Sequence, residues 1–549
     1  MEVIYYPIGF NVTWDKIELK HNGSEIMDKI SLVLFGICLW ECKEKLWNKR
    51  IDFHTPLEPI IYVLSVLMLP VIILTIAVFG IFKFMVGLCL RAKYKTNFGG
   101  LVTGGDVLWT IEEETSKNII NTLLIIDIKD QTLHSLKQSI INRVKNTLYR
   151  IEGSKITGIR QSELGYTFLL KNQYTAEEAI SFLPDINNGS VLEERELEDI
   201  VSEYSNKPLP KNDLALWQIL IGRNPVNYKG SKHYFLIFRI HHIVGDGSSL
   251  IQTMLDNFGD CVPKPPATNF RKEPDFVEQL VYLLNGIYTF IISFAFLVNQ
   301  SMFKHNDSSS LHGKELSGEK IVLWNTDEYP NLLEAVRAVK NKIPDTKFSE
   351  IIFSAISAGI SDYFCKISEN PPETATAIVP VVLTSSHTKL SNTFTIGLID
   401  IPIALKSSPT DNNILGQRLD EVKTKVSLIK ELVDYKINYW VLTVLCPVLP
   451  IPFLKLLVDV NKCTMGVSNL PGCCKISIFN GCNLKDIVFW VPHRGKTGLG
   501  FSILTYDNRL QLGLNVDKAL MPTKEDAQTV LNGISKYIVS LNQEVIGKL

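Results

Sequence analysis

The chain has 549 residues and a mass of 61.9 kDa, enough for two domains or for one large domain with two lobes. Its 56 basic and 57 acidic residues leave a net charge of −1, and this balance argues against a nucleic-acid binder. Hydrophobic residues make up 46% of the chain, which is too few for a polytopic transporter. Composition therefore predicts a globular body whose membrane contact is local.

The first predicted element is an uncharged apolar run at residues 60–82. As a helix it would be about 34 Å long, enough to cross a hydrocarbon core of about 30 Å. It begins too late for a signal peptide and lacks a small-residue cleavage pattern, so we expect it to be retained. Pro70 would kink it or turn it back as a re-entrant hairpin. A buried core helix is the alternative.

Two further apolar runs follow. Residues 279–298 lie between a Pro-rich and a polar segment, which favours a helix on or in the membrane surface, with a core helix as the alternative. Residues 437–460 carry three prolines, which exclude a single spanning helix. We expect that run to border an apolar pocket or the bilayer.

Elsewhere, predicted strands alternate with amphipathic helices. Residues 234–240 are a strand, and residues 501–514 form a hairpin that turns near 507–508. Apolar residues at helical spacing occupy 415–429 and 531–541. The ten cysteines are spread through apolar stretches without paired C-x-x-C units, so we expect reduced, buried thiols and no metal site. Reduced thiols fit a body that faces the cytosol.

The sharpest motif is HHIVGDG, from His241 to Gly247, placed directly after the strand at 234–240. With this composition, HHxxxDG arises by chance in about one of two thousand such sequences. The strand's period of two puts the two histidines on opposite faces, so only one of them faces a given channel.

His242 is the predicted general base, because an imidazole fixed at a strand end has a pKa near ambient pH. His241 is predicted to support it structurally. Asp246 and Gly247 form a turn-favouring pair, so Asp246 should brace the loop, through Arg239 or another arginine, and not take part in chemistry. A lone histidine is more often structural, but the full spacing favours a catalytic His242.

HHxxxDG is the signature of the CoA-dependent acyltransferase superfamily, and the chain most closely resembles the wax ester synthase/diacylglycerol O-acyltransferase family. The resemblance covers roughly residues 100–545. Its supporting segments are GGDVLWTIEEETSKN (104–118), LPKNDLALW (209–217), KLSNTFTIGLIDIPI (389–403), VSNLPG (467–472) and FSILTYDNRLQLGLNVD (501–517).

Four residues depart from the family pattern. Ala215 stands where proline is usual, and Ser391 replaces the glycine before Asn392. The family's Asn-Asp pair falls at Ser349 and Glu350, which puts any positioning role of that asparagine in doubt.

The resemblance implies an α/β fold of two chloramphenicol-acetyltransferase-like lobes with a tunnel at their interface, behind an N-terminal transmembrane or re-entrant helix. The expected division is a membrane-anchor region at 1–99, a first lobe with the HHxxxDG motif at 100–303, a linker at 304–320 and a second lobe at 321–549.

It further implies transfer of a long-chain acyl group from acyl-CoA to a fatty alcohol or a diacylglycerol, with no metal or cofactor. His242 would take the hydroxyl proton, and candidate substrate-binding or oxyanion groups are Asn392, Ser468, Asn469 and Gly472. The expected partners are acyl-CoA, the lipid acceptor and a bilayer. The expected location is the endoplasmic reticulum membrane, with the catalytic body in the cytosol. Another acceptor (a sterol, an amine or a small alcohol) and a non-catalytic lipid-binding protein are the alternatives.

Overall fold

A computed structural model describes residues 58–547 with several gaps. The gaps are residues 130, 151–154, 187–188, 261–306, 326–328, 330, 383–389, 406–413, 432–433 and 459–461. The helix predicted at 279–298 lies outside the described residues.

The first lobe is built around the long strand β9 (Ser231–His241), which contains the strand predicted at 234–240. It pairs antiparallel with β2 (Ile119–Asp127) on one side and with β7 (Trp217–Ile221) on the other. Most residues of these strands are buried, as expected for a sheet covered on both faces. The sheet order is β14, β15, β2, β9, β7, β5. The other strands are β5 (Ile180–Phe182), β14 (Ser477–Ile478), β15 (Cys482–Trp490) and the flanking β6 (Leu192–Glu193) and β8 (Val226–Tyr228).

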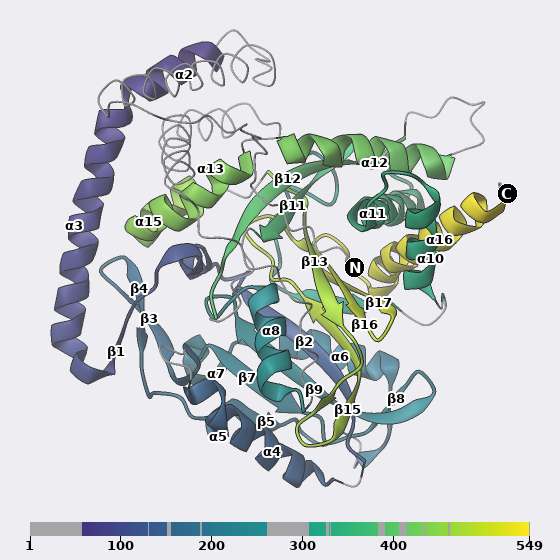
Figure 1. Cartoon of the computed structure of the whole chain (residues 1–549), viewed down its shortest axis with the longest axis horizontal. Coiled ribbons are helices and arrows are strands. Elements are labelled where there is room, and N and C mark those ends of the chain that lie inside the picture. Colours follow the sequence, from purple (N-terminus) through teal and green to yellow (C-terminus); the bar gives the residue numbers. More distant parts are fainter. Residues whose placement is uncertain are drawn as a thin grey trace, which may run out of the picture.

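Helices cover both faces of this sheet (Figure 1). On one face, α4 (Leu133–Asn146) and α8 (Gly247–Phe258) bury apolar side chains against β2 and β9. On the other face, α6 (Glu194–Asn206) packs against Leu123, Ile125 and Phe235. The short helices α5 (Ala176–Ala179) and α7 (Pro210–Asp213) lie near β5 and β7.

The second lobe is a mixed sheet in the order β10, β17, β16, β13, β11, β12. Its strands are β10 (Lys320–Trp324), β11 (Thr374–Val382), β12 (Phe394–Pro402), β13 (Met465–Cys473), β16 (Leu499–Tyr506) and β17 (Arg509–Asp517). Its covering helices are α10 (Leu332–Lys342), α11 (Phe348–Lys366), α12 (Ile414–Glu431) and α16 (Lys524–Gly547). These elements share one large apolar core.

Several sequence predictions are confirmed in this lobe. The hairpin β16–β17 turns at Asp507 and Asn508, which both have positive φ (47° and 58°) as a tight hairpin turn requires. The helices predicted at 415–429 and 531–541 are α12 and α16.

One segment that lies within the second lobe in sequence belongs to the sheet of the first lobe. β15 follows β13 in the second lobe but pairs antiparallel with β2 of the first sheet, from Asn483 opposite Asp127 to Trp490 opposite Asn121. The Trp490 indole then donates a hydrogen bond to the carbonyl of Leu323 at 2.9 Å. The α/β class and the two lobes are as predicted. The domain boundaries remain a prediction, and β14 and β15 do not follow them, because their ladder partners lie in the first lobe.

The N-terminal apolar run forms two helices, α2 (Glu58–Leu67) and α3 (Leu69–Tyr94). The break falls at Met68, and Pro70 lies in the first turn of α3, where its missing N–H costs nothing. Helix α3 ends beside a small sheet of β1 (Phe98–Leu101), β4 (Tyr166–Leu170) and β3 (Ile159–Glu163). Among the described residues, the segment 69–97 is the one helix long and apolar enough to cross a membrane.

The run at 437–460 is broken, as its prolines predict. It forms α13 (Asp434–Trp440), the π-helical turn η7 (Val441–Leu445), α14 (Cys446–Val448) and α15 (Ile451–Leu457). Seven cysteines fall in the described part of the chain, and all are free thiols. Cys446, Cys463 and Cys482 are buried and Cys473 is half-buried. The expectation that the thiols are buried is wrong for Cys89, Cys365 and Cys474, which are exposed.

Candidate active site

His242 lies one residue beyond the end of β9, where the two lobes meet. Its backbone N–H donates to the carbonyl of Asn118 at 2.9 Å, which continues the pairing of β9 with β2. The side chain is 9% exposed, so the imidazole is nearly enclosed but still reachable. The sheet therefore fixes the backbone that carries the ring.

Asn392, which precedes β12 in the second lobe, orients this ring. Its Oδ1 lies 2.9 Å from Nδ1 of His242. Its Nδ2 donates to the carbonyl of His242 and to Oδ1 of Asp106, both at 2.8 Å. Because both amide hydrogens are donated, Oδ1 must be the acceptor and Nδ1 of His242 must carry the proton. The imidazole therefore presents the lone pair of Nε2, the form that a general base needs.

Asp106 and Lys155 hold Asn392 in place. The helical segment η3 (Gly104–Thr110) carries Asp106, whose Oδ1 also accepts from the backbone N–H of Asn392 at 3.1 Å. Nζ of Lys155 lies 2.6 Å from Oδ2 of Asp106 and donates to the carbonyls of Ile243 and Val244. The result is a chain from Lys155 through Asp106 and Asn392 to Nδ1 of His242. It joins the first lobe to the second.

Trp109 covers one face of the His242 ring. The two ring centroids are 3.5 Å apart and the planes differ by 12°, and Phe394 lies 6.2 Å from both rings. Nε1 of Trp109 is buried and has no hydrogen-bond partner within the described residues. The guanidinium of Arg494 lies 5.8 Å from the Trp109 ring, and its Nη2 is likewise buried and unpartnered there. One unused donor thus belongs to the ring stacked on His242, and a second lies near that ring.

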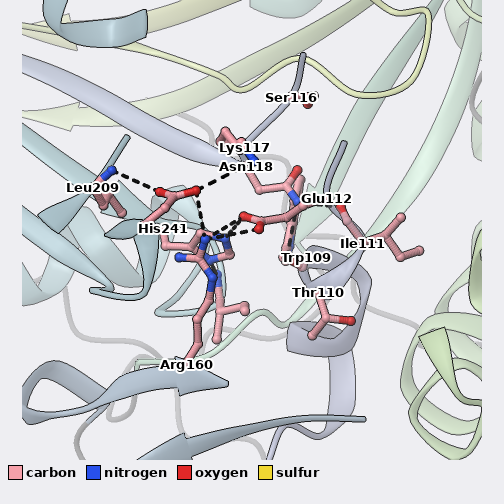
Figure 2. A network of polar contacts seen from close by, with 12 residues as sticks. Trp109, Thr110, Ile111, Glu112, Ser116, Lys117, Asn118, Arg160, Leu209 and His241 are labelled. Atoms are coloured by element: carbon pink, nitrogen blue, oxygen red, sulfur yellow. Dashed lines mark hydrogen bonds and ion pairs between the residues drawn. The ribbon is translucent and has the colours of Figure 1, made fainter. Parts of the chain in front are cut away.

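His241 points to the other side, into a network of charges (Figure 2). Its Nε2 lies 2.8 Å from Oε1 of Glu112, and its Nδ1 accepts the N–H of Ile243. Arg160 pairs with the same carboxylate at 3.0 Å and with Asp213 at 3.4 Å. Both ring nitrogens are hydrogen-bonded and the side chain is fully buried, so His241 has a structural role.

Burial keeps both imidazoles neutral. It lowers the pKa of His242 to about 3, against smaller opposing effects of Asp246 and the Asn392 hydrogen bond. The pKa of His241 is also lowered, first by burial, while Glu112 acts in the opposite direction. At neutral pH the Nε2 lone pair of His242 is therefore unprotonated. The expectation of a pKa near ambient pH is wrong, because the enclosed ring would lose solvation of its charged form.

Asp246 braces the loop, but not through an arginine. It caps α8, where its Oδ1 accepts the N–H of Ser249, and its Oδ2 accepts the N–H of Thr393, both at 2.9 Å. Arg239 instead binds the carbonyls of Lys207 and Pro208 on the other face of β9. The predicted partner was wrong because Arg239 and Asp246 lie on different sides of the strand. The bond to Thr393 places Asp246 beside Asn392, so it ties the loop to the second lobe.

The two glycines are needed for close packing. A Cβ on Gly247 would lie 2.5 Å from Cδ1 of Leu470 on β13, so the HHxxxDG loop abuts the SNLPG strand. A Cβ on Gly472 would lie 1.2 Å from the carbonyl oxygen of Thr505. The backbones of β13 and β16 therefore meet at Gly472.

The predicted substrate-binding residues do not form one cluster around His242. Ser468 and Asn469 lie within β13, not in a turn, and no contact recorded for the described residues joins them to His242. Asn392 does reach His242, but its amide hydrogens are already used, so it orients the base and is not an oxyanion donor. Ser349 and Glu350 occupy the positions of the family's Asn-Asp pair. The Glu350 carboxylate accepts the backbone N–H of Lys347 at the start of α11. Ser349 is buried beside it.

An apolar cavity lies between α8 and the first sheet, next to the strand that carries His242. It encloses about 880 Å³ of empty space, part of it open to solvent. Its wall includes Ile240 and Val244, which flank the two histidines, and Leu470 of β13. Trp217 is buried and also lines this cavity. The predicted interface tunnel stays a prediction.

Sequence reasoning missed Asp106, Trp109, Glu112 and Lys155 as site residues. The first three lie in the segment GGDVLWTIEEETSKN, so the resemblance contained a signal that pointed at them. Lys155 has no such signal, because its role depends on a contact with Asp106 across 49 residues of sequence.

A family model described as the WS/DGAT C-terminal domain matches residues 390–536, which include Asn392 and the SNLPG strand. A search of curated proteins finds no significant match.

Solved structures share the fold. The wax ester synthase/diacylglycerol acyltransferase from Marinobacter aquaeolei VT8 is similar over 81% of this chain and 99% of its own, with 16% identity and a TM-score of 0.53. The trichothecene 15-O-acetyltransferase from Fusarium sporotrichioides is similar over 80% of this chain and 94% of its own, with 10% identity and a TM-score of 0.55. The second lobe thus matches a WS/DGAT C-terminal domain model, and the chain shares its two-lobed fold with these acyltransferases.

Proposed function

We propose that this acyltransferase moves a long-chain acyl group from acyl-CoA to the hydroxyl of a fatty alcohol or a diacylglycerol, forming a wax ester or a triacylglycerol. The observation that carries the proposal is the state of His242. Asn392 accepts its Nδ1–H, so Nε2 is left as the proton acceptor in a nearly water-free site. This is the arrangement that a hydroxyl nucleophile needs.

The reaction needs one proton carrier. Nε2 of His242 takes the proton of the acceptor hydroxyl as the oxygen attacks the thioester carbonyl, and a tetrahedral oxyanion forms. When the C–S bond breaks, the thiolate of CoA takes that proton back from His242. The ester and free CoA leave, and the imidazole is neutral again. Every step uses residues of the protein and the two substrates.

Trp109 is the preferred oxyanion donor. Its Nε1–H is buried, lies on the ring stacked against His242 and has no other partner among the described residues. Arg494 adds a buried positive charge behind it, because burial lowers the pKa of its guanidinium only to about 10. A donor held in a dry site stabilises developing negative charge strongly, by about 3 to 4 kcal/mol in measured cases.

The apolar cavity under α8 is the proposed site of the acyl chain. Its lining side chains are apolar apart from two threonines, Thr122 and Thr253. Such a wall favours a hydrocarbon chain and penalises a charged group.

The apolar helix α3 supports work at a membrane, where long-chain alcohols and diacylglycerols reside. We place the protein at the endoplasmic reticulum, with the catalytic body in the cytosol, where acyl-CoA is supplied.

The test uses membranes from cells that express the protein, supplied with labelled acyl-CoA and with either a fatty alcohol or a diacylglycerol. His242→Ala should abolish ester formation, and His134→Ala, a change of an exposed histidine on α4, should leave it unchanged. The preferred acceptor decides between wax ester and triacylglycerol. Ester formation by wild type that equals that of membranes lacking the protein would make the protein a lipid binder, and equal product above that level from wild type and His242→Ala would exclude His242 as the base.

A further inference from the structure

One face of α3 packs against the protein along the length of the helix. The side chains that are at least partly covered recur every three or four residues. They are Ile72, Ile76, Phe79, Lys83, Val86, Leu90 and Tyr94. Ile76 and Phe79 pack against the cluster built by η7, α14 and α15, and Val86 and Leu90 pack against β4. This side of α3 is therefore turned toward the protein.

The opposite face of α3 is exposed and apolar. Leu74, Ile81 and Phe84 are each about two thirds exposed (64%, 66% and 64%). Val71, Ile73, Val78, Phe82, Met85 and Leu88 are also exposed. Leaving one such side chain in water costs about 1.5 to 3 kcal/mol relative to burying it. A continuous row of them indicates an apolar environment beyond the protein.

Two other elements extend this apolar face. On α15, Leu456 is 81% exposed and Phe453 is 49% exposed, and the Phe453 ring lies 4.9 Å from that of Phe79 on α3. At the tip of the β3–β4 hairpin, Leu164 is 60% exposed. The next residue, Gly165, accepts the N–H of Ile451 of α15 at 2.8 Å, which holds the tip against α15.

Leu164 is an unusual choice for its position. Its φ is 52°, in the left-handed region where Asn, Asp and Gly are preferred. Turn geometry alone therefore does not account for a leucine there. An apolar surrounding that receives its side chain does.

Basic residues border the face. Arg91 and Lys95 are exposed at the end of α3, and Lys455 is exposed between Leu454 and Leu456 on α15. Apolar side chains next to Lys and Arg match a lipid leaflet, whose acyl chains and phosphate groups have the complementary chemistry.

We infer that α3, α15 and the tip of the β3–β4 hairpin form one membrane face that sits in a single leaflet of a bilayer, and that the lipid acceptor reaches His242 from this face. In this arrangement α3 lies along the protein surface and does not span the bilayer. The entry of the acceptor from this face rests on the proposed function.

A continuous apolar layer connects this face to the base. It begins at Phe79 on α3, passes Leu454 of α15 and Leu445 of η7, and ends at Phe394 and Trp109, the two rings next to His242. The π-helical turn η7 lies in its middle, and such turns are frequent at functional sites. This cluster is packed, so an acceptor that enters from the membrane face reaches Nε2 as these apolar side chains move apart.

The test compares the full-length double variant Leu164→Asn/Leu456→Glu with Ile414→Glu, which alters an exposed apolar residue (51%) on α12 of the second lobe. Asn suits the positive φ at 164, so the double variant should keep the fold. The first readout is flotation with phosphatidylcholine/phosphatidylserine vesicles. The double variant should partition at least about tenfold less than wild type, and Ile414→Glu should match wild type.

The second readout is ester formation with a long-chain acceptor dissolved in the vesicles and with a short, water-soluble alcohol. The double variant should lose at least about tenfold with the dissolved acceptor and nothing with the soluble one. Equal flotation of all three proteins would overturn the membrane face, as would a shift from dimer to monomer in the double variant without loss of flotation. Equal loss with both acceptors would overturn loading from the membrane. If wild type makes no ester at all, the proposed function fails, and flotation still decides the membrane face.

Discussion

Oδ1 of Asn392, from the second lobe, lies 2.9 Å from Nδ1 of His242, from the first. This contact across the lobes sets the tautomer of the base, because the amide of Asn392 is fixed by Asp106 and by the His242 carbonyl. The reactive form of the imidazole thus depends on how the two lobes are docked.

Asn392→Ala should lower kcat about 10² to 10³-fold with little change in KM, since the ring loses the acceptor that holds Nδ1–H. Loss of tautomer control in a comparable hydrogen-bonded imidazole lowers kcat about 10⁴-fold. Steady-state kinetics measures the effect. Asn227→Ala, which removes a surface bond to Glu193, is the matched control and should behave as wild type. A main effect on KM would mean that Asn392 binds substrate.

Lys155→Met should destabilise the fold by about 3 to 5 kcal/mol, because it leaves the carboxylate of Asp106 buried without its partner. Asp106→Asn keeps the Oδ1 that accepts from Asn392, so the double variant Lys155→Met/Asp106→Asn should recover part of this loss. Denaturant unfolding of the four proteins completes the cycle. Additive losses would show that the two side chains do not form a coupled pair.

Trp109→Phe should keep the ring stacked on His242 but remove Nε1–H, lowering kcat about 10- to 100-fold if this group donates to the oxyanion. Trp109→Ala removes both the donor and the stack and should lose more. An unchanged kcat in Trp109→Phe, measured at saturating acyl-CoA, would assign the oxyanion to another donor.

The pH dependence of kcat/KM should show no acid limb between pH 7 and pH 5. Burial lowers the pKa of His242 to about 3, so the ring stays neutral and able to accept a proton over this range. An ordinary pKa of about 6.5 would instead reduce the rate about 30-fold at pH 5. An acid limb near pH 6.5 in the wild-type profile would contradict the burial of His242, provided that a His242 variant with residual activity lacks that limb.

Gly472→Ala should prevent folding or destabilise it severely, since its Cβ would overlap the backbone oxygen of Thr505. Gly247→Ala should cost less, about 1 to 3 kcal/mol, because the atom it meets ends the flexible side chain of Leu470. Thermal unfolding ranks the two variants. Equal, small effects would mean that β13 and β16 separate easily.

The sequence alone determined the strand that carries the histidines, the hairpin at 507–508, the helices α12 and α16, and the broken run at 437–460. These elements follow from local periodicity and from turn and proline chemistry, which act over a few residues. The motif likewise singled out His242 and the bracing role of Asp246.

Only the tertiary structure decided which groups meet at the base. Asp106, Lys155 and Asn392 are far apart in sequence, and their hydrogen-bonded chain exists because the docking of the two lobes brings them together. It also decided which side of α3 is covered, because a mostly apolar sequence does not mark that side. Packing between lobes is a long-range outcome, whereas periodicity reports only on neighbours along the chain.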